Sequence, residues 1–151
     1  MMRVFTGADE LLAAAGEQLG TSDWMVIEQR RVNAFADATE DHQWIHIDPQ
    51  RAAAGPFGTT IAHGFLTLSL LPYLIFQTYR VDGAAMTINY GLNKVRFPAP
   101  VPVGSTVRAE VMLAEATEVT GGVQLVLRAT MQIEGGAKPG CVADWVTRIY
   151  F

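Results

Sequence analysis

Residues 39–79 of the chain read TEDHQWIHIDPQRAAAGPFGTTIAHGFLTLSLLPYLIFQTY, a stretch that passes from clustered titratable side chains into a long apolar run. Between residues 63 and 79 the apolar side chains are too many to share one stripe of a helix. Because a helix that is apolar on every side is buried inside a protein, we expect an enclosed central helix here. Pro72 removes one backbone hydrogen bond inside this run, so the helix should bend or end early.

Beyond residue 83 the apolar residues recur with the period of a strand. Apolar and polar residues alternate along four stretches: 86–97, 106–115, 123–134 and 142–151. This alternation is typical of antiparallel strands that bury one face, and segments rich in glycine and proline separate the stretches. The order of helices first and strands afterwards predicts an α+β fold. A curved sheet wrapped around the central helix would supply the cover that the helix needs.

The first 60 residues predict shorter elements. Apolar spacing indicates a helix over residues 6–18 with Thr6 as its cap, a short extended piece over residues 24–27, and a second helix over residues 28–38. Asp48 followed by Pro49 is typical of a helix start, so a brief helix should span residues 49–54.

Composition limits the class of protein. With 151 residues, half of them hydrophobic, the chain is long enough for one compact domain over residues 1–151 and too short to favour two. Its 11 basic and 15 acidic residues are scattered, which argues against a nucleic-acid partner. The apolar run is well under the ~20 residues that a membrane helix needs. A single cysteine, Cys141, and an N-terminus unlike a signal peptide point to the cytoplasm.

Asp41 and His46 are the candidates for acid/base chemistry. On a regular helix these side chains would point to different sides, so we expect them to cooperate across a loop. An aspartate and a histidine held near one water can take up a proton and return one. The alternative is that Asp41 caps a helix and His46 fills a polar gap. We favour chemistry for this pair, and we favour a capping role for Asp48.

A zinc site in the same stretch is the competing interpretation. The available ligands are Asp41, His42, His46, Asp48 and His63. The four-residue step from His42 to His46 indicates a shared site only on a regular helix, and the neighbouring Trp44, Ile45 and Pro49 argue against one. We therefore expect no metal, a surface position for His42, and a role for His63 in orienting the loop before the central helix.

Gly64 lies where the central helix should begin. The start of a helix has unpaired N–H groups and partial positive charge, so it can stabilise an oxygen on which negative charge develops. A glycine would let a substrate approach without a Cβ in the way. It could equally serve close packing of the helix against the sheet, and both readings stay open.

The strand segment that contains Tyr90 and Gly91 also carries the basic residues Lys94 and Arg96, which could meet the phosphates of a bound molecule. An exposed strand face with a bulge is the favoured interpretation for each of these residues. We therefore assign no phosphate ligand.

Two segments together resemble a known family. DATEDHQWIHIDPQRAAAGPFGTTIAHGF (residues 37–65) and NYGLNKVRFPAPVPVGSTVRAEV (residues 89–111) are similar to the MaoC-like dehydratase family, specifically the single-domain (R)-specific enoyl-CoA hydratases of its NodN-like branch. The resemblance covers nearly the whole chain. It implies the hot-dog fold, in which a curved antiparallel sheet wraps a long helix, and it implies pairing of two such units as a homodimer.

The resemblance also implies roles for three residues. The catalytic acid of the family falls on Asp41, its histidine on His46, and the backbone N–H that polarises the thioester carbonyl on Gly64. The implied reaction is the reversible addition of water to a trans-2-enoyl-CoA, giving an (R)-3-hydroxyacyl-CoA. It uses no metal and no cofactor, because coenzyme A is part of the acyl-CoA substrate. A hydroxyl that some relatives carry further along the helix has no match at residues 71–73.

Two other functions are weighed beside hydration. A hot-dog thioesterase would want a carboxylate on or beside the central helix, and residues 63–79 contain none. A non-catalytic acyl-thioester-binding protein would keep the fold without the reaction.

Overall fold

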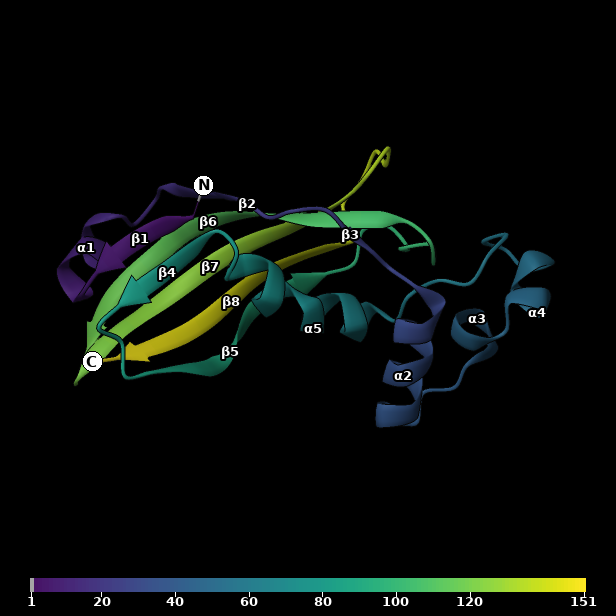
Figure 1. Ribbon diagram of the computed structural model, residues 1–151, viewed down its shortest axis with the longest axis horizontal. Coiled ribbons are helices and arrows are strands. Elements are labelled where there is room, and N and C mark those ends of the chain that lie inside the picture. The colour runs from purple at the N-terminus through teal and green to yellow at the C-terminus, as the bar shows by residue number, and fades with distance from the viewer. Residues whose placement is uncertain (1) are drawn as a thin grey trace.

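The computed structural model describes residues 2–151 and shows an α+β fold built on one curved antiparallel sheet (Figure 1). Four long strands form most of this sheet: β5 Met86–Arg96, β6 Thr106–Val119, β7 Gly122–Ile133 and β8 Cys141–Tyr150. The strand order is β2-β6-β7-β8-β5, with β3 also paired to β6. The four predicted strands are therefore confirmed. They form the hot-dog architecture that the resemblance implied.

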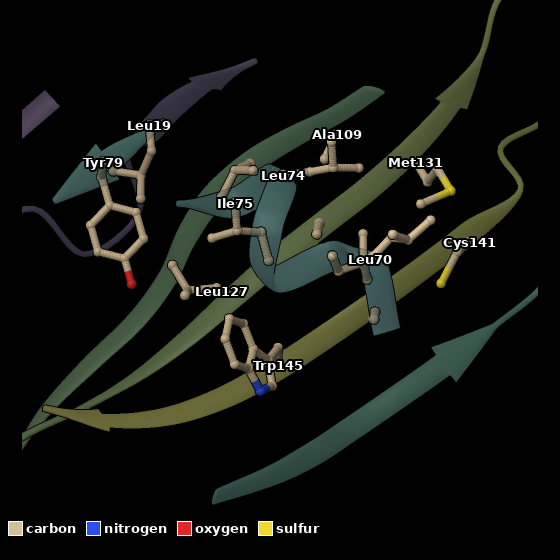
Figure 2. Close-up of a cluster of buried hydrophobic side chains, with 14 of the residues drawn as sticks. Leu19, Leu70, Leu74, Ile75, Tyr79, Ala109, Leu127, Met131, Cys141 and Trp145 are labelled. Atoms are coloured by element: carbon tan, nitrogen blue, oxygen red, sulfur yellow. The ribbon is translucent and has the colours of Figure 1, made fainter. Parts of the chain in front are cut away.

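The central helix, α5, spans Gly64–Ile75 and packs across the concave side of the sheet. Figure 2 shows its buried side chains Leu70, Leu74 and Ile75 beside Leu127 and Trp145 of the sheet. Burying each such aliphatic side chain contributes ~1.5–3 kcal/mol relative to leaving it in water. This contact holds the start of α5 at a set place relative to the sheet.

The outer face of α5 contradicts the predicted enclosure of the helix. Phe65 is 71% exposed and Tyr73 is 61% exposed, because the sheet curves around only one side of the helix. The helix also ends at Ile75, three residues after Pro72, and Tyr79 begins the short strand β4 Tyr79–Asp82. Helix α5 thus has one apolar face packed in the core and a second apolar face that is open to solvent.

The N-terminal segment differs from the predicted helix over residues 6–18. Strand β1 Arg3–Thr6 runs parallel to β4, α1 spans only Ala8–Ala13, and β2 Gln18–Thr21 joins the main sheet. Thr6 lies in β1, and Gly7 precedes the helix as its N-cap. Gly16, at a φ of 91°, turns the chain and donates its N–H to the Leu113 carbonyl. This turn ends the helical region and starts β2.

Three helices gather beyond the start of α5: α2 Gln29–Thr39, α3 Trp44–Ile47 and α4 Pro49–Ala53 (Figure 1). The short strand β3 Met25–Val26 leads into α2, as the extended prediction for this segment required. The Asp48 side chain accepts a hydrogen bond from the Arg51 N–H at 3.0 Å, which confirms Asp48 as a helix cap. The three helices bring the titratable stretch to the end of α5.

Strand β5 is an edge strand and is exposed along most of its length on both faces. The prediction of a half-buried strand is therefore wrong for β5, because no strand within residues 2–151 pairs with its outer edge. Its register against β8 shifts between Asn89 and Gly91, which confirms the expected bulge. None of the helices within residues 2–151 is long and apolar enough to cross a membrane.

Candidate active site

Asp41 lies in the turn between α2 and α3. Glu40 caps the C-terminus of α2 with a φ of 63°, a left-handed conformation that turns the chain out of the helix. The Asp41 carboxylate is exposed, and its Oδ1 lies 3.4 Å from the Gln43 N–H. Its main-chain carbonyl accepts a hydrogen bond from His63 Nε2 at 2.9 Å. The carboxylate is therefore open to water while its backbone is held.

His46 is buried, with 7% of its surface exposed, and one ring nitrogen is committed to the backbone. Its Nδ1 lies 2.7 Å from the Ile61 carbonyl oxygen. Since a carbonyl oxygen only accepts, Nδ1 must carry the proton, and Nε2 of the neutral ring carries a free lone pair. His46 thus presents a proton acceptor at a defined atom.

A second set of hydrogen bonds holds the backbone at His46. Its carbonyl accepts from Gln29 Nε2 at 2.7 Å, and Gln29 Oε1 accepts from Thr60 Oγ1 at 2.6 Å. The next residue in that loop, Ile61, donates its N–H to the Ile45 carbonyl. Helix α2, helix α3 and the loop before α5 are therefore tied together at this histidine.

The predicted pair is brought together, and His63 joins it. Asp41, His46 and His63 each offer one side-chain ligand atom, and these atoms lie within 4.8 Å of one another. The predicted loop around His46 is wrong in detail, because His46 lies on the single helical turn α3. Helix α2 ends at its cap residue Glu40 and the new helix α3 follows, so the side chains of Asp41 and His46, five residues apart, can approach one another.

His63 is the site residue whose position the sequence predicted least well. Its ring stacks on that of His46, with centroids 3.8 Å apart and planes inclined by 23°, and Phe35 packs against it at 4.9 Å. It is only 3% exposed. The one sequence signal for its position was that it directly precedes Gly64 at the helix start.

The three ligand atoms do not suit a single metal ion. Imidazole nitrogens bind a metal through lone pairs that lie in the ring plane. The rings of His46 and His63 are stacked with nearly parallel planes, so an ion between them would lie out of both planes. His42 is not one of these three residues: it is exposed and pairs with Asp37 at 2.9 Å, and this hydrogen bond raises the pKa of His42. The surface position expected for His42 is confirmed.

Gly64 is the first residue of α5, so its N–H belongs to the first turn, which has no intrahelical acceptor. A Cβ added at Gly64 would lie 3.2 to 3.3 Å from three carbons of the Phe97 ring. Phe97 follows β5 and is 44% exposed. The absence of a Cβ therefore makes room for Phe97, which supports the packing interpretation of this glycine. The direction of its N–H is a separate property that this contact leaves open.

A cavity of about 160 Å³ runs along α5 beside strand β5. Leu68 and Pro72 line it from the helix, and Leu92 and Trp145 line it from the sheet. The cavity lies along the helix that begins at Gly64 and has mostly apolar walls. A hydrocarbon chain fits such walls better than a polar group does.

Comparison with known proteins gives the family context of this geometry. A family model described as "MaoC like domain" matches residues 10–134. The 3-hydroxyacyl-thioester dehydratase Z of Mycobacterium tuberculosis strain H37Rv is 61% identical over 97% of this chain and 98% of its own length. Nodulation protein N of Rhizobium leguminosarum bv. viciae is 46% identical, over 90% and 86% of the two chains. The solved (R)-hydratase from A. caviae superposes with a TM-score of 0.71 at 28% identity, over 88% and 94% of the two chains.

Proposed function

The chain belongs to the MaoC-like dehydratase family, and from that premise we propose that it is an (R)-specific enoyl-CoA hydratase. As a family member it is a hydro-lyase that acts on thioesters. The finer proposal is that it adds water reversibly to a trans-2-enoyl-CoA and gives an (R)-3-hydroxyacyl-CoA. The observation that carries this proposal is the meeting of the Asp41 carboxylate and the His46 ring beside the start of α5.

In the proposed mechanism Asp41 and His46 carry out two proton transfers, one from the water and one to the substrate. Water is too weak a nucleophile to attack an alkene unaided, so His46 Nε2 accepts a proton as the water oxygen bonds to C3. Asp41 holds the same water through its exposed carboxylate. The electrons of the double bond move toward the thioester carbonyl. Asp41 and His46 then return a proton to C2. One O–H bond of water and the π bond between C2 and C3 are thus broken, and one C–O bond and one C–H bond are formed.

Gly64 is proposed to stabilise the enolate that forms between these steps. Charge builds on the thioester oxygen as the water adds, and an N–H at the start of α5 offers both a hydrogen bond and the positive end of the helix dipole. The acyl chain would then follow the cavity between α5 and β5.

We propose that the protein pairs with a second copy of itself. The open face of α5 and the exposed edge strand β5 present apolar side chains to solvent, among them Phe65, Tyr73 and Ile88. Exposed apolar side chains beside an unpaired strand edge are typical of a surface that another chain covers. A homodimer would cover it with the same surface of its twin.

We propose that the reaction needs no metal and no cofactor other than the coenzyme A of the substrate. The inclined stack of His46 on His63 supports this, because it keeps the two lone pairs from converging on one ion. We propose that the protein works in the cytoplasm, because a reducing compartment suits its single cysteine, the free and buried Cys141.

The test of the proposed function uses crotonyl-CoA. Loss of absorbance in the conjugated thioester band without release of free thiol indicates hydration. Loss of absorbance with thiol release indicates the thioesterase, and a constant spectrum with measurable binding indicates the non-catalytic binding protein. Either of the last two results overturns the proposal. Chiral analysis of the product then decides the (R) assignment.

A further inference from the structure

We propose that His63 is a positioning residue, which sets the orientation of both Asp41 and His46 for the reaction. This inference rests on the proposed function for its kinetic consequences. Its structural content stands separately, because it concerns contacts among three residues of the chain.

The first contact of His63 is with the backbone of Asp41. His63 Nε2 lies 2.9 Å from the Asp41 carbonyl oxygen and must donate to it. Asp41 follows a left-handed residue in an exposed turn, and within the described residues its carboxylate accepts one long hydrogen bond, from the Gln43 N–H at 3.4 Å. The hydrogen bond from His63 is therefore the link between the Asp41 turn and the start of α5. Among residues 2–151, no other side chain donates a hydrogen bond to that carbonyl.

The second contact is with the ring of His46. The stack at 3.8 Å covers one face of the His46 imidazole, and the hydrogen bond to Ile61 restrains the ring within its plane. Together they allow one orientation, in which Nε2 is the atom left free. A ring that could tilt would not keep Nε2 aligned with the water, and a displacement of 1 Å at a catalytic group costs ~10²-fold in rate.

His63 itself is held by burial and by its place in the chain. It is buried against Phe35 and is the residue directly before α5, whose first residue is Gly64. Its Nδ1 carries the remaining lone pair, and no donor faces that atom within residues 2–151. A buried imidazole that keeps one nitrogen without a partner is costly for stability alone. Its two directed contacts to the proposed acid/base pair supply a reason for a histidine at this position.

Three variants separate the two contacts. His63→Phe keeps a ring for the stack and loses the donor, His63→Gln keeps a donor of similar reach and loses the stack, and His63→Ala loses both. We expect roughly a tenfold fall in kcat for each of the first two and ~10²-fold for the third, with KM little changed. The matched control is His42→Phe, an exposed histidine of the same stretch, which should leave kcat unchanged.

A double variant tests whether His63 acts through its neighbour. If His63 only orients the pair, its stack has no effect once the His46 ring is gone, and only its hydrogen bond to Asp41 still matters. His46→Gln combined with His63→Ala should therefore be at most roughly tenfold slower than His46→Gln alone, short of the full ~10²-fold loss expected for His63→Ala. Multiplication of the two losses would overturn the proposal, as would full kcat in His63→Ala. Rates are normalised to the folded fraction from near-UV circular dichroism, so a loss that disappears on normalisation also overturns it.

Nitrogen NMR of the His46 ring supplies a readout that needs no activity. In the unchanged protein His46 should carry its proton on Nδ1, and His63→Ala should shift or broaden both ring nitrogen signals. Unchanged His46 signals in His63→Ala would overturn the positioning role. A wild-type protein that hydrates no enoyl thioester but shows this shift would refute the proposed function and leave the inference about His63 standing.

Discussion

Replacing Gly64 with alanine distinguishes the two roles that a glycine can have at the start of α5. The added Cβ would lie 3.2 to 3.3 Å from the Phe97 ring, slightly inside ordinary van der Waals contact. Phe97 is half-exposed and can move outward by a few tenths of an ångström. We therefore expect a packing cost near ~1 kcal/mol, at the low end of the range for overpacking. The gain from replacing glycine in a helix, ~0.5–1 kcal/mol, offsets most of it.

The expected change in Tm for Gly64→Ala is accordingly small, within ~4 °C for a chain of this length. Turnover should fall more, roughly tenfold, because moving the ring and the first turn of α5 displaces the N–H proposed to meet the enolate. The assay is initial-rate hydration of crotonyl-CoA beside thermal unfolding of the same samples. Gly91→Ala is the matched control, since nothing lies within 4 Å of a Cβ added there.

The second variant, Phe97→Leu, decides what the new methyl group meets. If the methyl group collides with Phe97, the double variant Gly64→Ala/Phe97→Leu should recover to the activity of Phe97→Leu alone, within roughly threefold. If Gly64→Ala slows Phe97→Leu by as much as it slows the wild type, the methyl group obstructs the substrate itself. That result would refute the packing explanation of Gly64.

Three further predictions concern the open face of α5, the buried Cys141 and the possible metal ligands. Tyr73→Glu on the open face of α5 should turn a dimer into a monomer by light scattering, because it places a charge on an apolar interface; an unchanged mass would contradict the proposed pairing. Cys141 should resist thiol reagents at pH 8 until the protein unfolds, since burial raises its pKa to about 11, although a hydrogen bond with Thr67 lowers it; rapid labelling of folded protein would contradict this. Dialysis against a chelator should leave hydration unchanged, and loss of activity restored by zinc would contradict the proposal that the reaction needs no metal.

The sequence predicted the fold well where one physical pattern dominates a segment. The alternation over residues 123–134 matched β7, because that strand lies between two others with one face on the core. Strand β5 begins with the same alternation of apolar and polar residues but lies at the sheet edge, and the alternation does not distinguish an edge strand from a central one. In α5 the apolar residues on both faces looked like one buried surface, because a core face and an open face use the same residue types.

The sequence predicted which residues form the candidate site but did not predict the shape of the site. Asp41 and His46 do meet, but the turn that brings them together depends on a left-handed conformation at Glu40, which is not a glycine. Propensity gave no reason to expect that conformation there. The stack of His63 on His46 joins residues 17 positions apart and depends on tertiary packing, so spacing could not have shown it.

The central claim is that Asp41 and His46 act on one water molecule at the start of α5. The most direct measurement is kcat/KM for crotonyl-CoA hydration by Asp41→Asn and His46→Gln, with Asp37→Asn as a control on the exposed side of α2. We predict a loss of ~10²–10⁴-fold for each site variant with the fold retained, and no loss for the control. Wild-type turnover in either folded site variant would contradict the claim.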